Sequence, residues 1–129
     1  MDHFLLVISA PPSLSSFLQL ELTRGRQIDR GNAQSASLGA DFGRFMPSFW
    51  KDLQTYDAGS LTWKKDLDAL NDWRNAIVHQ DFTSPKLGGI MKLRIRQVRS
   101  WRRSCARLAK SMDAVIRIHL QHLTGTAPW

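Results

Sequence analysis

The chain has 129 residues, of which 43% are hydrophobic and 22% charged, and it contains one cysteine. This length and composition indicate a single globular domain over residues 1–129 and exclude an intrinsically disordered chain. A lone cysteine excludes an intramolecular disulfide framework, so we expect a reducing, cytoplasmic setting.

The N-terminal third begins with a short apolar run at residues 4–10, which has no cationic leader and is followed by two prolines. This run is too short to span a membrane and matches a secretion signal poorly, so we interpret it as a packing segment. Ser13 is the expected N-cap of a helix that ends near Gly25. Residues 24–43 are polar and punctuated by glycines, and we predict a long loop over 31–43 with no more than a single helical turn.

Three further helices are predicted after this loop. Asp41 is the expected cap of the first, which passes Pro47 near its start and ends near Tyr56. The next carries residues 63–78, and a long last helix extends from about residue 90 to residue 123. No convincing strand pattern occurs, so the predicted fold class is all-α: an antiparallel helical bundle with a long basic C-terminal helix.

The most informative stretch is residues 70–82. Apolar residues recur before and within it at helical spacing, namely at Trp63, Leu67, Leu70 and Ile77. Arg74 occupies the missing position on this line, so we expect its charge to face a core or a partner and to need an anion, a carboxylate or a wet cleft. His79 lies four residues after Asn75 and shares its face. An arginine and a histidine in one cleft can handle a phosphodiester, as a fixed cation and a proton-transfer group.

Arg74-Asn75-Ala76-Ile77-Val78-His79 resembles the signature of the HEPN superfamily, in which an arginine, usually followed by a polar residue, precedes a histidine by a few residues. The similarity continues through residues 70–73 and 80–82 and extends loosely over residues 49–123. It implies an HEPN-like helical bundle that dimerises and, in active members, a metal-independent endoribonuclease with two motifs in one cleft. One branch of the family carries a tyrosine two residues after the histidine, as a target for nucleotide transfer by a partner enzyme, and Asp81 occupies that position here.

The resemblance assigns catalysis to Arg74, Asn75 and His79. His79 would act as general base or acid on a ribose 2′-hydroxyl, and Arg74 would stabilise charge on the scissile phosphate. Asn75 would orient His79 or the phosphate. This chemistry selects RNA over DNA and needs no metal or other cofactor. The structural alternative is that Arg74 pairs with Asp72, Asp81 or an aspartate of a neighbouring helix, while His79 is a helix C-terminal histidine favoured by the dipole.

The last helix carries two kinds of side chain at helical spacing. Its predicted apolar seam comprises Met91, Ile95, Val98, Cys105, Leu108, Met112 and Val115. Its basic stripe comprises Lys92, Arg96, Arg99, Arg103, Arg107, Lys110 and Arg117. Residues 86–117 contain ten basic residues and one acid. Because like charges at these spacings repel, we predict that the first six members of the stripe bind RNA, the alternative being a solvated face.

The remaining candidates have simpler interpretations. Trp73 and Trp101 are expected to pack in the core. His119 and His122 are three residues apart, but no nearby Cys, Asp or Glu completes a metal site, so we assign them a structural or solvent role. Cys105 is expected to be an inert buried thiol.

The sequence thus predicts a metal-independent endoribonuclease that cleaves RNA by 2′-hydroxyl attack, of a toxin or defence-effector type. Its expected partners are RNA, a second copy of the chain, and an antitoxin or a nucleotidyltransferase, without a membrane. The alternative is a non-catalytic HEPN-like module for dimerisation or for binding RNA or a partner. A third possibility is a basic nucleic-acid-binding helix protein without cleft chemistry.

Overall fold

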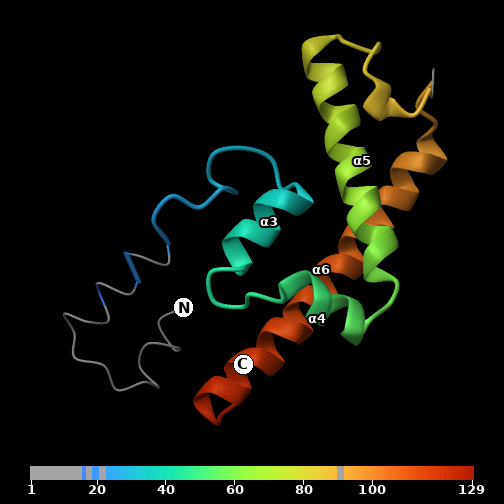
Figure 1. Ribbon diagram of the computed structural model, residues 1–129. Helices are drawn as coiled ribbons and strands as arrows, with labels where there is room; N and C mark the ends of the chain where they lie inside the picture. The colour runs from blue at the N-terminus through green and yellow to red at the C-terminus, as the bar shows by residue number, and fades with distance from the viewer. Residues whose placement is uncertain (1–15, 17–18, 21–22, 90–91) are drawn as a thin grey trace.

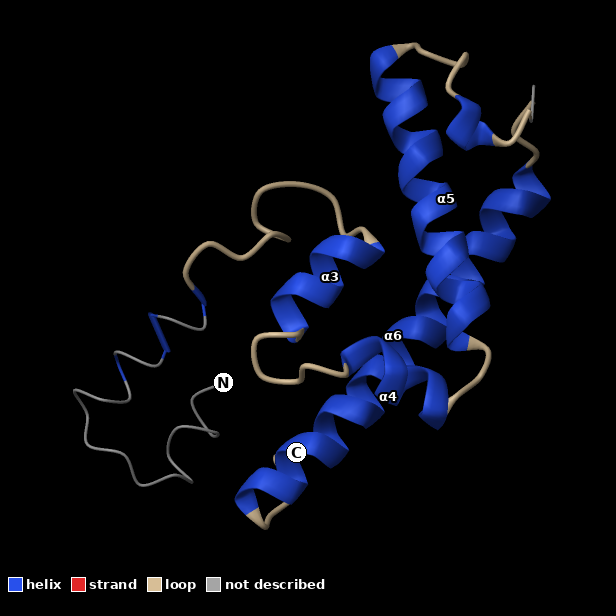
Figure 2. Ribbon diagram, in the orientation of Figure 1, coloured by secondary structure: helices blue, strands red, loops and turns tan. Residues whose placement is uncertain are grey.

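The computed structural model describes residue 16 and residues 19–20, 23–89 and 92–129 (Figure 1). Its elements are α3 (Ser35–Phe42), α4 (Phe49–Tyr56), α5 (Ser60–His79), the 3-10 helix η1 (Pro85–Leu87) and α6 (Ile95–Thr124). Figure 2 shows helices and loops, and no strand, in this part of the chain, which confirms the predicted all-α class. The apolar run at 4–10 and the predicted cap Ser13 lie outside the described residues.

The two long helices form the frame of the molecule. α5 and α6 run in opposite directions and cross, and α4 packs against both of them near the crossing (Figure 1). α3 packs on α4 and α5, whereas η1 packs against α5 at the opposite end. No helix among the described residues has both the length and the apolar character needed to cross a bilayer.

The larger of two apolar clusters, here called the main core, joins α3, α4, α5 and α6. Its buried members are Leu38, Met46, Phe49, Leu53, Leu67, Leu108 and Val115. Phe49 and Leu53 are one helical turn apart, so α4 directs both into this core although it has only eight residues. The Phe49 ring stacks on Phe42 with 4.9 Å between centroids, which connects α4 to the end of α3.

The smaller cluster, here called the motif-end core, joins α5, η1 and α6. Its buried members are Trp73, Ala76, Leu87 and Trp101. The expected packing role of both tryptophans is therefore confirmed, since Trp73 is 5% and Trp101 2% exposed. Leu93 packs against this cluster from the segment before α6, and so the first turns of α6 lie near the end of α5.

The prediction of a long loop over 31–43 is wrong, because α3 occupies most of it. Asp68 of α5 accepts hydrogen bonds from the Ser35 N–H (2.9 Å) and Ser35 Oγ (2.5 Å). It thus provides an acceptor for a backbone N–H in the first turn of α3, which has no partner within the helix. The Ser35 carbonyl in turn accepts the Trp50 indole N–H at 3.2 Å. A Cβ at Gly39 would lie 2.6 Å from Trp50 Nε1, so only glycine permits this approach. Tertiary contacts therefore hold a helix that local pattern does not predict.

Asp41 does not cap α4 as predicted. Its carboxylate accepts the N–H groups of Gln27 (2.8 Å) and Ile28 (2.9 Å) and so anchors the preceding loop. Desolvation raises the pKa of Asp41, but these two hydrogen bonds, with Arg44 and Arg26, outweigh it and hold the pKa below its ordinary value.

The predicted seam of α6 is only partly correct. The positions that are buried are Trp101, Ser104, Leu108, Ser111 and Val115, while Val98, Cys105 and Met112 are half-buried. α6 begins at Ile95 rather than near residue 90, and Ile95 is 69% exposed. Met91 lies outside the described residues.

Two serines replace apolar residues on the buried face of α6 and keep its surface close to α5. Ser104 Oγ donates to Asp66 Oδ2 at 2.5 Å, which gives the two helices a polar contact. Cys105 is half-buried rather than fully buried. Burial raises the pKa of the Cys105 thiol, and the Asp66 carboxylate raises it further, so the group is an unreactive thiol at neutral pH.

Candidate functional site

A line of polar side chains on α5 holds the segment that precedes α3. This polar ladder comprises Asp68, Asn71 and Asn75, spaced so that all three share one helix face. Besides the Asp68 contacts with Ser35, Asn71 Nδ2 donates to the carbonyls of Ala33 (3.0 Å) and Leu67 (2.9 Å). Asn71 is only 8% exposed, so its amide fixes the segment from within the fold.

Asn32 completes the ladder and joins two residues of the motif. Its Nδ2 donates to Asn75 Oδ1 at 3.0 Å, and its Oδ1 accepts a hydrogen bond from Arg74 Nη1. Because a guanidinium only donates, the Asn32 oxygen must face Arg74 and its NH₂ must face Asn75. Among the described residues the Asn75 NH₂ has no partner, so it and the other Arg74 N–H groups present donors to a ligand.

Arg74 does not face the core of its own chain, and whether it faces a partner stays a prediction. Arg74 is exposed, and Ile77, the next residue on the predicted apolar line, is 53% exposed. The buried positions at this end of α5 are Asn71, Trp73 and Ala76, because the two tryptophans of the motif-end core set the face that meets α6.

The structural alternative, in which Arg74 pairs with an aspartate, is not seen among the described residues. The ion pairs formed there join Arg26 to Asp29 and Arg44 to Asp41, and neither Asp72 nor Asp81 pairs with Arg74. Its hydrogen-bond partner is the neutral amide of Asn32. A neutral partner orients the guanidinium without cancelling its charge, so Arg74 keeps its full attraction for an anion.

His79 is the last residue of α5 and is exposed. It lies one turn beyond Asn75, a rise of about 6 Å along the helix. The helix ends there because Gln80 adopts φ +53°, and the N–H groups of Gln80 and Asp81 donate to the carbonyls of Ile77 (3.3 Å) and Ala76 (3.0 Å). Since no described residue hydrogen-bonds its ring, His79 is free to turn toward a ligand.

Asp81 bounds the site on the far side of His79. Hydrogen bonds from the Thr83 hydroxyl (2.7 Å) and the Thr83 N–H (3.0 Å) hold the pKa of Asp81 below its ordinary value, with a smaller contribution from His79. Asp81 is therefore ionised at neutral pH and repels anions. A phosphate approaching the motif is favoured on the Arg74 side and disfavoured beyond His79.

Three large apolar side chains lie exposed around the motif. This motif-end patch comprises Ile77, Val78 and Phe82, which are 53%, 61% and 57% exposed. The Phe82 ring lies 6.4 Å from the Trp73 ring, so the patch adjoins the motif-end core. Single exposed apolar residues are ordinary, but three within six consecutive residues beside a charged site indicate a candidate interaction surface.

The described part of the basic stripe is exposed along its whole length, from Lys92 to Arg117. Arg103, for example, is five residues from Leu108, and so the two point about 140° apart around the helix. The stripe thus lies on the side of α6 away from its buried positions. Its first members lie toward the motif end and Arg107 and Lys110 toward the crossing with α5, and among the described residues no hydrogen bond or ion pair joins the stripe to Arg74 or His79.

The two remaining histidines of interest have different surroundings. His119 Nε2 lies 3.0 Å from the Phe45 carbonyl and donates to it, because a carbonyl only accepts, which gives His119 a structural role. His122 is exposed. Within the described residues, no three His, Cys, Asp or Glu side chains lie close enough together to hold a metal ion.

Comparisons of the chain with protein-family models, with curated proteins and with solved structures give no match.

Proposed function

We propose that the protein is a metal-independent, HEPN-like endoribonuclease of the toxin or defence-effector type. The observation that carries this proposal is the arrangement of Arg74, an exposed guanidinium oriented by the neutral amide of Asn32 beside Asn75. His79 follows one turn later with a free ring. The site thus offers a fixed cation, a neutral donor and a proton-transfer group, which are the groups that cleavage of a phosphodiester requires.

In the proposed reaction, His79 takes the proton of a ribose 2′-hydroxyl and the 2′-oxygen attacks the adjacent phosphorus. The bond from phosphorus to the 5′-oxygen breaks, and that oxygen takes a proton as it leaves. The products are a 2′,3′-cyclic phosphate and a 5′-hydroxyl. Arg74 and the Asn75 NH₂ stabilise the negative charge that grows on the phosphate oxygens. DNA lacks the attacking hydroxyl and is not a substrate.

The proposed working unit is a homodimer in which the motif-end patches of two copies meet. Ile77 and Val78 lie on either side of Arg74 on the exposed face of α5, so covering them brings the Arg74 side chains of two copies close together. A two-fold arrangement would supply one His79 as base and the other as acid. Two Arg74 side chains near the axis would repel, and a bound RNA phosphate relieves that repulsion. The proposed setting is cytoplasmic, with an antitoxin or a nucleotidyltransferase as a further partner.

The second candidate is a non-catalytic HEPN-like module that dimerises or binds RNA or a partner. The observation that favours it is the combination of the motif-end patch with the exposed basic stripe, since both act without proton transfer. In that case Arg74 and Asn75 serve mainly to anchor Asn32 and the segment before α3.

The test is cleavage of single-stranded RNA by the purified protein in EDTA, with the 3′ ends of the products identified. We expect 2′,3′-cyclic phosphate ends, and we expect His79→Ala to lower the rate on the order of a hundredfold or more because the general base is lost. His122→Ala is the matched control, since it removes another exposed histidine near a helix end. Cleavage by His79→Ala at the wild-type rate would contradict the assignment. RNA binding without cleavage by the wild-type chain would favour the second candidate.

A further inference from the structure

The chain before α3, residues 24–34, is fixed at both of its ends and is here called the anchored segment. At its start, the Arg44 guanidinium donates to the carbonyls of Arg24 (2.7 Å) and Gly25 (3.0 Å). The Asp41 carboxylate accepts two backbone N–H groups further along. The polar ladder of α5 holds the other end, where the chain enters α3. With contacts at both ends, the anchored segment brings its last residues to a fixed place beside α5.

The anchored segment runs antiparallel to α5 where the two meet. Asn32 contacts Asn75, and the next residue contacts Asn71, one turn earlier on α5. Because the Asn71 amide is buried, it fixes the backbone beside Asn32 and keeps the segment from sliding along the helix. Asn32 is half-buried, and both ends of its amide are occupied, one by Asn75 and the other by Arg74.

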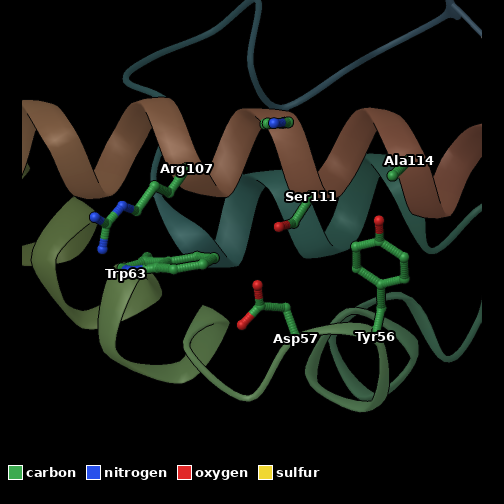
Figure 3. Close-up of a pocket in the computed structure, with 7 residues that line it drawn as sticks. Tyr56, Asp57, Trp63, Arg107, Ser111 and Ala114 are labelled. Carbon is green, nitrogen blue, oxygen red and sulfur yellow. The ribbon is translucent and has the colours of Figure 1, made fainter.

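Arg74 differs from other arginines of the described residues in the group that sets its direction. Arg26 and Arg44 are paired with carboxylates. Figure 3 shows the Arg107 guanidinium extending toward the Trp63 side chain, at a hollow between α4, α5 and α6. The partner of Arg74 among the described residues is instead a neutral amide oxygen. An amide oxygen occupies one N–H of the guanidinium and leaves its charge and its other N–H groups for a ligand.

The donors that Asn32 holds lie within reach of His79. The Cα–Cβ bonds of a helix tilt toward its N-terminus, so the His79 side chain leans toward Asn75, one turn earlier on α5. Arg74 is directed to the same place, because the Asn32 amide joins it to Asn75. Without this contact the long, flexible arginine side chain would sample many directions. A phosphate oxygen bound here would receive two kinds of N–H donor beside the free imidazole ring.

We propose that Asn32 is a positioning residue for the proposed phosphodiester cleavage, because its neutral amide directs the Arg74 guanidinium and the Asn75 NH₂ at the phosphate oxygens. A carboxylate at position 32 would form an ion pair with Arg74 and draw the Asn75 NH₂ to its second oxygen, so both donors would be lost to the ligand. The identity of the ligand rests on the proposed function, whereas the effect of Asn32 on the direction of Arg74 does not require cleavage.

The first test compares two substitutions of Asn32 by steady-state cleavage of RNA. Asn32→Ala leaves Arg74 undirected and should lower kcat about tenfold to a hundredfold with little change in KM, because the basic stripe is expected to hold most of the strand. Asn32→Asp should lower kcat by on the order of a hundredfold or more. Gln34→Ala is the matched control, since it removes another amide of the same chain region that hydrogen-bonds no described residue, and it should leave kcat unchanged.

The order of the two variants separates positioning from a purely structural role. Thermal unfolding should show that Asn32→Asp is the more stable of the two, because it keeps an acceptor for Arg74. If Asn32 served only to hold the anchored segment, activity would follow stability and Asn32→Asp would be the more active variant. That order would overturn the proposal, and so would a wild-type kcat in Asn32→Ala. If Asn32→Ala does not fold, a kcat of Asn32→Asp near the wild-type value is the result that overturns it.

The second test does not depend on cleavage. A 2′-O-methyl oligonucleotide, whose attacking hydroxyl is blocked, is added to ¹⁵N-labelled protein, and the Arg74 Nε–H signal is followed by NMR after assignment by its loss in Arg74→Lys. We expect the strand to shift this signal in the wild type and in Gln34→Ala, but not in Asn32→Asp. An equal shift in Asn32→Asp, or no shift in the wild type, refutes the positioning role. A shift in the wild type without cleavage of unmodified RNA refutes only the nuclease.

Discussion

The two apolar cores of this protein differ in how completely they are enclosed. The main core receives side chains from four helices, and Met46, Phe49 and Leu53 within it are no more than 2% exposed. The motif-end core receives side chains from two helices and a 3-10 turn, and Ile77, Val78 and Phe82 lie exposed beside it. The candidate catalytic residues thus occupy the less enclosed end, where surface is left for a partner and a ligand.

The largest expected effect is on the free energy of unfolding, when one buried leucine in each core is truncated. Leu53→Ala should lower the free energy of unfolding by about 4 kcal/mol, because a fully buried site surrounded by four helices cannot collapse around the lost atoms. Leu87→Ala should cost about 2 kcal/mol, since η1 is short and can relax into the gap. Chemical denaturation followed by circular dichroism measures both values. Equal losses would mean that the motif-end core is as rigid as the main core.

A smaller effect is expected from the surface of the motif-end core. Val78→Lys should raise the dimer dissociation constant about tenfold or more, because a charge would replace an apolar side chain at the proposed interface. Analytical ultracentrifugation over a dilution series measures this constant. Leu123→Lys is the control, with a similar exposure of 58% near the end of α6. If Val78→Lys and the wild type dissociate alike, the motif-end patch is not the contact between copies.

The smallest effect concerns the residue that ends α5. Gln80→Gly should raise the free energy of unfolding by about 0.5–1 kcal/mol, because glycine adopts the positive φ of this position without the steric penalty that glutamine has. Thermal unfolding measures the gain. Gly88 has a similar φ of +62°, and a Cβ added there would meet nothing within 4 Å, so Gly88→Gln should show the opposite sign through its backbone alone. A loss of stability in Gln80→Gly would mean that the glutamine side chain holds the turn by contacts of its own.

Hydrophobic periodicity predicted the long helices well and the polar ladder not at all. Leu67, Leu108 and Val115 are buried as their helical period predicts, and Trp73 and Trp101 are buried as expected of tryptophans. α3 escaped prediction because its start is satisfied by Asp68, which is 33 residues away in the sequence. Arg74 points away from the core of its own chain for a related reason, since the tryptophans of the motif-end core set the buried face of α5.

The charged residues of the candidate site could be predicted from the sequence, but the hydrogen bonds that orient them could not. Arg74, Asn75 and His79 were found from one local pattern, and the stripe from the near absence of acids in α6. Asn32 carried no local signal beyond its place in a polar segment, although functional residues are common in such segments. Its role depends on the polar ladder, which only the folded structure brings against it.

The contact between Asn32 and Arg74 spans 42 residues and so has a consequence for synthesis. Chains leave the ribosome from the N-terminus, so Asn32 emerges before the residue it will orient. At ordinary elongation rates the delay is about 2–8 s. During that interval Asn32 has neither Arg74 nor Asn75 as a hydrogen-bond partner. The first turn of α3 likewise lacks its acceptor, Asp68. A nascent chain therefore has neither an oriented Arg74 nor the start of α3 until α5 has left the ribosome.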